Sequence, residues 1–164
     1  MTKKRPTITI WRVGNLQKLF RKTRIFNWSL ASAITPKVVH TTPDQWRGSA
    51  NAGSSIIINI GARFSDSPDF DKFDWLRDLR AFGGSEARSL ARQLIESWLQ
   101  QNISWHMKRW QPDIMGQRVS NMIFCYDWYA QSAAEDFQVR LTQSIALQSK
   151  CLALDWQKLI EQTA

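Results

Sequence analysis

The sequence contains few residues of the kinds that build disulfide frameworks, metal centres or membrane spans. Its two cysteines, Cys125 and Cys151, are too few for a disulfide framework and lack the Cys-x-x-Cys spacing of a metal site. Each lies in a helical apolar pattern, so we expect buried, reduced thiols, which favours a cytoplasmic chain. No run approaches the ~20 apolar residues of a membrane-spanning helix, and charged residues interrupt the segment where an export signal would lie.

Residues that serve as general acids and bases are also scarce. The only histidines are His40 and His106, and the only tyrosines are Tyr126 and Tyr129. The two tyrosines fall in a helical pattern beside Trp128, which predicts packing, and His106 lies in a tryptophan-rich loop. No Ser–His–Asp, Cys–His or metal-ligand arrangement follows from the spacing. We therefore predict no catalytic residue, no metal and no cofactor in this chain.

Acidic residues are missing from the first 43 positions. That segment holds nine Lys or Arg, whereas the rest holds 13 basic and 14 acidic residues, so the net charge of +8 arises at the N-terminus. Apolar residues recur there at helical spacing from Thr7 to about Ser32, with Trp11 and Trp28 interleaved, which predicts a basic amphipathic helix. Such a helix either binds nucleic acid or anionic lipid, or packs on the following helices with its basic side in water.

From Phe73 onward the sequence has the pattern of successive helices. The first ends at Gly83-Gly84, because glycine adopts the left-handed conformation that closes a helix. The second, from about Ser85 to Gln101, has one apolar face, and the third runs from about Asp113 to Gln131 after a first-turn proline. A fourth long helix follows Ser132, which has the capping-box spacing to Glu135. These patterns predict an all-α fold of antiparallel helix pairs.

The stretch from Thr35 to Ser67 is predicted to be an irregular arm. Prolines and glycines, including Gly48 and Gly53, interrupt any helix, and the run Ile56 to Ile60 has strand character. We expect an extended segment lying on the helical body. Residues 1–67 are thus assigned to the basic helix and the arm, and residues 68–164 to the helical core, within one structural unit.

Four carboxylates cluster just before the first core helix. They are Asp66, Asp69, Asp71 and Asp74. The ordered spacing and turn glycine of a calcium loop are missing. We predict that these residues cap the free N–H groups at the helix start and meet the positive end of its dipole.

Three segments carry a resemblance to a known family. They are Pro43-Asp44-Gln45-Trp46-Arg47-Gly48, the run Trp75-Leu76-Arg77-Asp78-Leu79-Arg80-Ala81 followed by Gly83-Gly84, and Trp110-Gln111-Pro112-Asp113-Ile114-Met115-Gly116-Gln117-Arg118. In this order they resemble the N-terminal region of bacterial heparinase II/III family proteins. The resemblance covers about Pro43 to about Leu154, which is the front part of the family's usual length.

The resemblance implies a polysaccharide lyase that cleaves uronic-acid linkages by β-elimination. It also implies an incomplete α/α toroid followed by a β-sandwich, with catalytic residues that lie beyond this chain. We therefore expect an N-terminal helical fragment that is inactive alone, with an open apolar edge for the missing part of the protein or for a second copy. An acidic polysaccharide is the implied ligand. The alternative is an interaction module that binds nucleic acid or anionic lipid through residues 1–43.

Nine tryptophans invite a carbohydrate-binding interpretation, because an indole face stacks on a sugar ring. Trp75 and Trp98 fit helix faces and are predicted to be core. Trp46, Trp105 and Trp110 fall in loops and are the candidate carbohydrate contacts. For Trp105 and Trp110 the competing hypothesis is that they hold the loop between the second and third helices.

Overall fold

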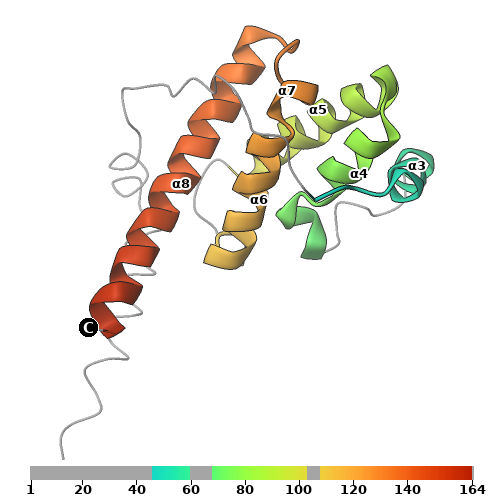
Figure 1. The fold of residues 1–164 in the computed structure, drawn as a ribbon. Coiled ribbons are helices and arrows are strands. Elements are labelled where there is room, and N and C mark those ends of the chain that lie inside the picture. Colours follow the sequence, from blue (N-terminus) through green and yellow to red (C-terminus); the bar gives the residue numbers. More distant parts are fainter. Residues whose placement is uncertain (1–45, 60–67, 103–107, 164) are drawn as a thin grey trace, which may run out of the picture.

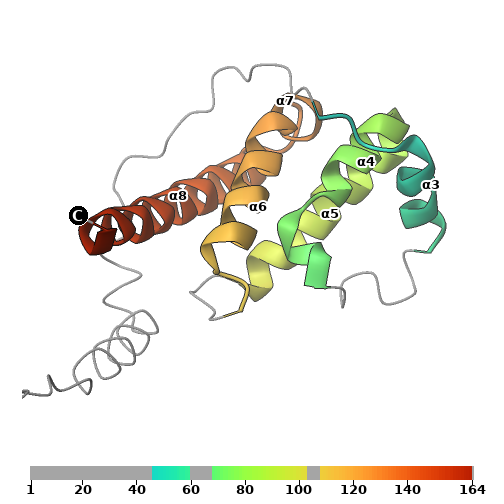
Figure 2. The same cartoon turned by 60° about the horizontal axis from the view of Figure 1, so that its bottom comes forward.

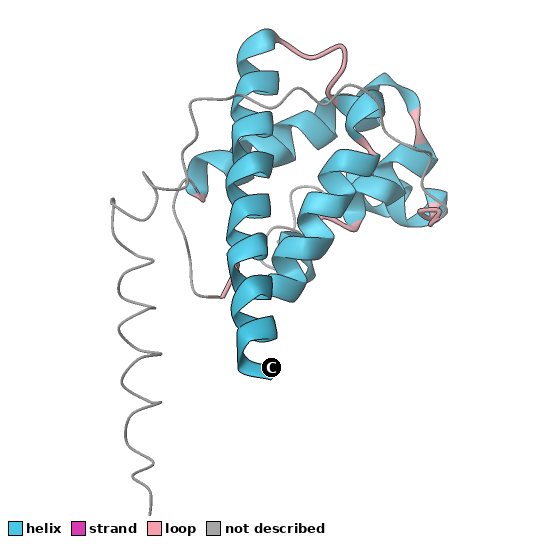
Figure 3. Cartoon of the chain, turned by 60° about the vertical axis from the view of Figure 1, so that its left-hand side comes forward, coloured by secondary structure: helices cyan, strands magenta, loops and turns pink. Residues whose placement is uncertain are grey.

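A computed structural model describes residues 46–59, 68–102 and 108–163, with side chains described as far as residue 157 (Figure 1). These residues form α3 (Ala50–Ile58), the 3-10 turn η2 (Pro68–Lys72), α4 (Trp75–Phe82), α5 (Gly84–Gln101), α6 (Pro112–Phe124), α7 (Tyr126–Tyr129) and α8 (Glu135–Thr163). The described residues contain no strand, and the predicted all-α class is confirmed (Figure 3). The predicted basic helix within residues 1–43 lies outside them.

The helices pack as two antiparallel pairs with α3 added at one side (Figure 2). Helix α3 lies against α4, α4 lies against α5, and α6 lies against α8. Between the pairs, α6 also contacts η2 and α4. Within the described residues no helix is both long enough and apolar enough to cross a membrane.

The predicted limits of the α4–α5 pair are confirmed. Gly83 and Gly84 both have positive φ, +80° and +81°, so the chain reverses there without a side-chain clash. The predicted face of α5 is buried except for Leu94, which is half-buried; the buried residues are Ala87, Leu90, Ala91, Ile95, Trp98 and Leu99. Pro112 begins α6, where its missing N–H has no helical partner.

The extended arm was a wrong prediction for its described part, because residues 50–58 form helix α3. Ser49 caps this helix, since its Oγ accepts from Ala52 N at 3.3 Å, and its own N–H donates to Asp78 Oδ1 at 2.7 Å. Gly48 and Gly53 lie at the contact with α4. A Cβ on Gly53 would lie 2.3 Å from the Asp78 carbonyl oxygen, and one on Gly48 would lie 2.1 Å from that of Arg77. Glycine therefore permits close helix packing here.

The predicted third helix is divided into α6 and α7. Trp128 N–H, which would reach the Phe124 carbonyl in a continuous α-helix, donates instead to Cys125 O at 3.0 Å. The predicted capping box at Ser132 is not formed, because α8 begins at Glu135 and Ser132 Oγ accepts from Arg92 Nη2 at 2.8 Å. Cys125 and Cys151 are both buried, as predicted.

Candidate functional site

The side chains of Asp71 and Asp74 do not cap α4, which corrects the sequence prediction for these two carboxylates. Asp74 makes no cap hydrogen bond, and its Oδ1 accepts from Asn121 Nδ2 at 2.8 Å. Asp71 Oδ1 accepts from Trp98 Nε1 at 2.8 Å. These bonds tie the turn before α4 to α5 and α6, because buried indole and amide N–H groups need acceptors. Asp66 lies outside the described residues.

Arg118 is a buried structural residue that sequence reasoning missed. Its guanidinium donates to Gln148 Oε1 and to the Asp71 carbonyl, both at 2.7 Å, and to the Arg109 carbonyl at 3.0 Å. It also lies 4.4 Å from the centre of the Trp98 ring. Burial lowers the pKa of Arg118 to about 10, and the charge of Asp71 opposes this shift. Arg118 therefore remains charged at neutral pH and joins η2, α5, α6 and α8.

The structure describes two of the three candidate tryptophans, of which one is buried and one is exposed. Trp110 is only 2% exposed, so it packs in the core and is no surface platform for a sugar. This burial agrees with the competing hypothesis that it holds its loop. Trp105 lies outside the described residues. Trp46 is 69% exposed and remains a candidate.

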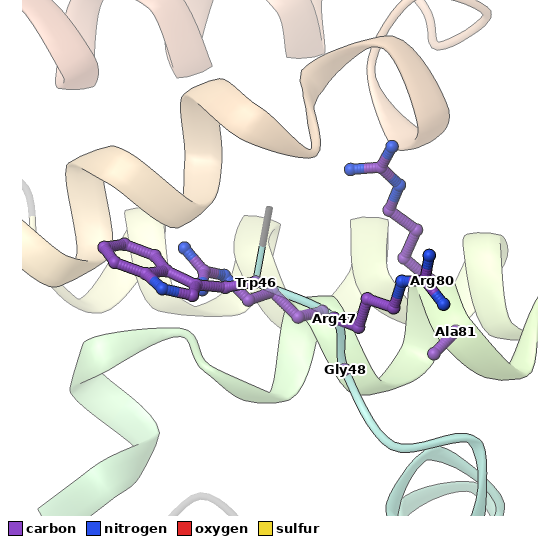
Figure 4. Close-up of a pocket in the computed structure, with 6 residues that line it drawn as sticks. Trp46, Arg47, Gly48, Arg80 and Ala81 are labelled. Atoms are coloured by element: carbon purple, nitrogen blue, oxygen red, sulfur yellow. The ribbon is translucent and has the colours of Figure 1, made fainter. Parts of the chain in front are cut away.

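Trp46 lies in a surface pocket of about 290 Å³ between its own segment and α4 (Figure 4). The pocket is lined by Trp46, Arg47, Gly48, Arg77, Arg80 and Ala81. The Arg77 guanidinium carbon lies 5.0 Å from the centre of the Trp46 ring, within the range of a cation–π contact. Trp46 and Arg80 lie toward opposite ends of the group of labelled side chains.

Two sequence segments separated by nearly thirty residues meet at this pocket. Gly48 brings the segment 46–49 onto the backbone of α4, and the Ser49 N–H bond to Asp78 fixes it there. That bond occupies Oδ1 of Asp78, the acidic residue next to Arg77 in the sequence. Arg77 and Arg80 are one helical turn apart on α4, so both face the segment. The site thus combines one indole with three guanidinium groups.

Arg80 has a second contact outside the pocket. Its Nη1 donates to the Phe124 carbonyl, at the end of α6, at 3.0 Å. The helix is interrupted at Cys125, so this carbonyl does not accept the N–H of Trp128 and accepts from the guanidinium instead. Arg80 therefore connects the pocket to the junction between α6 and α7.

The two tyrosines are packing residues, as predicted. Both are buried, and the Tyr129 hydroxyl donates to the Met122 carbonyl at 3.1 Å. Burial raises the pKa of both phenols, that of Tyr129 well above 10.0. The histidines His40 and His106 lie outside the described residues. In the described part of the chain, His, Cys, Asp and Glu side chains form no group that fits a metal ion.

Comparisons with protein-family models, with curated proteins and with solved structures found no match for this chain. The resemblance to the heparinase II/III family therefore stays a prediction.

Proposed function

We propose that this chain binds an acidic polysaccharide at the Trp46 pocket, as the helical part of a heparinase II/III-like polysaccharide lyase. The observation that carries the proposal is the exposed indole of Trp46 beside Arg47, Arg77 and Arg80. An indole face stacks on the apolar face of a sugar ring, and a guanidinium pairs with a carboxylate or a sulfate through parallel N–H donors. A uronic-acid chain carries both features.

The packing of the resemblance segments supports the same proposal. The turn that contains Trp46 and Gly48 lies directly on the Trp-Leu-Arg-Asp-Leu-Arg-Ala run of α4. Both segments line the pocket, so residues that carry the resemblance contribute to one surface. In this proposal the pairs α4–α5 and α6–α8 belong to an incomplete α/α toroid.

The proposal assigns binding, and no bond cleavage, to these residues. The tyrosines are in the core, and a general base must reach the proton that it removes. The purified chain should therefore release no unsaturated uronate, which absorbs in the ultraviolet, from uronic-acid polysaccharides. Release of such products would contradict this part of the proposal.

Binding is tested by calorimetric titration of the full chain with a galacturonic acid tetrasaccharide, using a maltotetraose titration as the neutral control. Trp46→Ala should weaken binding of the acidic tetrasaccharide about tenfold, since it removes stacking and the cation–π contact. The matched control is Trp156→Ala, because Trp156 is comparably exposed, at 65%, but lies on α8. It should leave the affinity unchanged.

Two outcomes would contradict the site. Equal binding of both tetrasaccharides would mean that charge recognition plays no part. An unchanged affinity in Trp46→Ala, lost on deletion of residues 1–43, would assign anion binding to the basic N-terminal segment instead.

A further inference from the structure

We infer that Arg80 couples the Trp46 pocket to the junction between α6 and α7, so that an anionic ligand and the Phe124 carbonyl compete for its guanidinium. The inference rests on the proposed function and adds a conformational response to it. Its basis is one side chain in two places: Arg80 lines the pocket, and its Nη1 donates to Phe124 O at 3.0 Å.

The Phe124 carbonyl depends on this donor because of how the helix ends. Trp128 and Tyr129 both donate their N–H groups to Cys125 O, at 3.0 and 3.3 Å. The carbonyl of Phe124 is thereby left without the N–H that a continuous helix would supply. A guanidinium at a helix C-terminus satisfies such a carbonyl and also meets the negative end of the helix dipole.

A carboxylate or sulfate is a stronger acceptor for a guanidinium than a neutral carbonyl is. Charge-assisted hydrogen bonds are shorter and about twice as strong as neutral ones, and Arg pairs with carboxylates through two donors at once. An anion bound beside Arg47 and Arg77 lies within the same pocket as the Arg80 side chain. Ligand binding therefore draws the guanidinium from Phe124 O and loosens the end of α6.

A second arginine supplies the matched control. Arg92 of α5 donates from Nε to the carbonyl of Tyr129, the last residue of α7, at 2.7 Å, and from Nη2 to Ser132 Oγ. Like Arg80, Arg92 donates from its guanidinium to a carbonyl at a helix end, here that of α7, but it does not line the pocket. Removing either arginine should loosen the connection, whereas only Arg80 should link that loosening to the ligand.

The experiment is amide hydrogen exchange over residues 125–130 in the full chain, with and without saturating galacturonic acid tetrasaccharide. In the unsubstituted chain and in Arg92→Gln, the ligand should speed exchange roughly threefold to tenfold, the effect of losing one hydrogen bond. In Arg80→Gln, exchange should be faster already without ligand, and the ligand should add nothing. Maltotetraose should leave the exchange rate over residues 125–130 unchanged in all three proteins.

Linkage gives a second test at a distance from the pocket. If the ligand loosens the junction, then loosening the junction must tighten the ligand by the same factor. Tyr129→Phe removes the hydroxyl that donates to Met122 O at 3.1 Å, and Tyr129 does not line the pocket. It should lower the dissociation constant of the tetrasaccharide, whereas Tyr129→Phe combined with Arg80→Gln should show no such gain.

The outcomes separate the two proposals. Binding of the tetrasaccharide with unchanged or slower exchange at 125–130 overturns the coupling and leaves the binding site intact. No binding at all overturns the proposed function, and the coupling falls with it. Arg80→Gln with ordinary exchange in the absence of ligand refutes the role of Arg80 at the junction, whatever the ligand does.

Discussion

Helix α3 and helix α6 each contain an interior glycine, and the two glycines should respond in opposite ways to the same substitution. An alanine in place of a helix-interior glycine stabilises the helix by about 1 kcal/mol, because it restricts the unfolded chain and favours helical backbone. At Gly116 of α6, an added Cβ meets nothing within 4 Å. Gly116→Ala should therefore raise the free energy of unfolding by about that amount.

At Gly53 of α3 the same methyl group meets the backbone of α4. It would lie 2.3 Å from the Asp78 carbonyl oxygen and 2.8 Å from Phe82 Cβ, so the helices would have to separate by about 1 Å. Overpacking of this kind costs about 1–3 kcal/mol or more, and separation also stretches the 2.7 Å bond from Ser49 N to Asp78. The loss exceeds the gain in helix propensity, so Gly53→Ala should be destabilising.

Urea unfolding and thermal unfolding of the two variants measure the difference directly. For a chain of this size, 1 kcal/mol shifts Tm by about 2–4 °C, upward for Gly116→Ala and downward for Gly53→Ala. Amide exchange in α3 provides a local readout, since an undocked α3 loses protection while the rest of the fold keeps it. The reasoning is refuted if Gly53→Ala raises Tm as Gly116→Ala does and α3 keeps its protection.

Two further predictions concern the buried polar groups. Arg118→Lys should lower the free energy of unfolding by about 2–4 kcal/mol, because the guanidinium reaches its acceptors from two separate nitrogens, Nε and Nη1, whereas an ammonium donates from one atom only. A loss below about 0.5 kcal/mol in urea unfolding would contradict this. Burial raises the pKa of Tyr129 well above 10.0, so its stabilising contribution is fully present below pH 10 and is lost as the pH rises toward the folded-state pKa. Unfolding free energies measured from about pH 8 to about pH 11 should therefore fall more steeply for the unsubstituted chain than for Tyr129→Phe. The same pH dependence in both proteins would contradict this prediction.

Several elements were predictable because their causes are local in the sequence. Gly83 and Gly84 form the turn between α4 and α5, since glycine takes a positive φ without strain. The face of α5 follows from apolar spacing, and the start of α6 follows from Pro112. Burial of the tyrosines and of both cysteines followed from the same periodicity.

The errors occur where a distant helix decides the local structure. Gly48, Gly53 and the isoleucine run predicted an extended arm by local propensity, yet residues 50–58 are helical and pack on α4. The close approach of that helix explains the glycines, and nothing in the segment itself reveals it. Likewise, Asp71 and Asp74 have the position of helix caps, but donors from α5 and α6 bind them instead.

The sequence by itself determined the all-α class, the turn at Gly83-Gly84 and the apolar face of α5, because helical periodicity and glycine conformation act within a few residues. Only the tertiary structure decided that Trp110 is buried while Trp46 is exposed beside Arg77. Burial and cation–π contacts depend on which helices pack together, and the segments that form the pocket are far apart along the chain. The candidate site is therefore a product of the packing of residues 46–49 on α4.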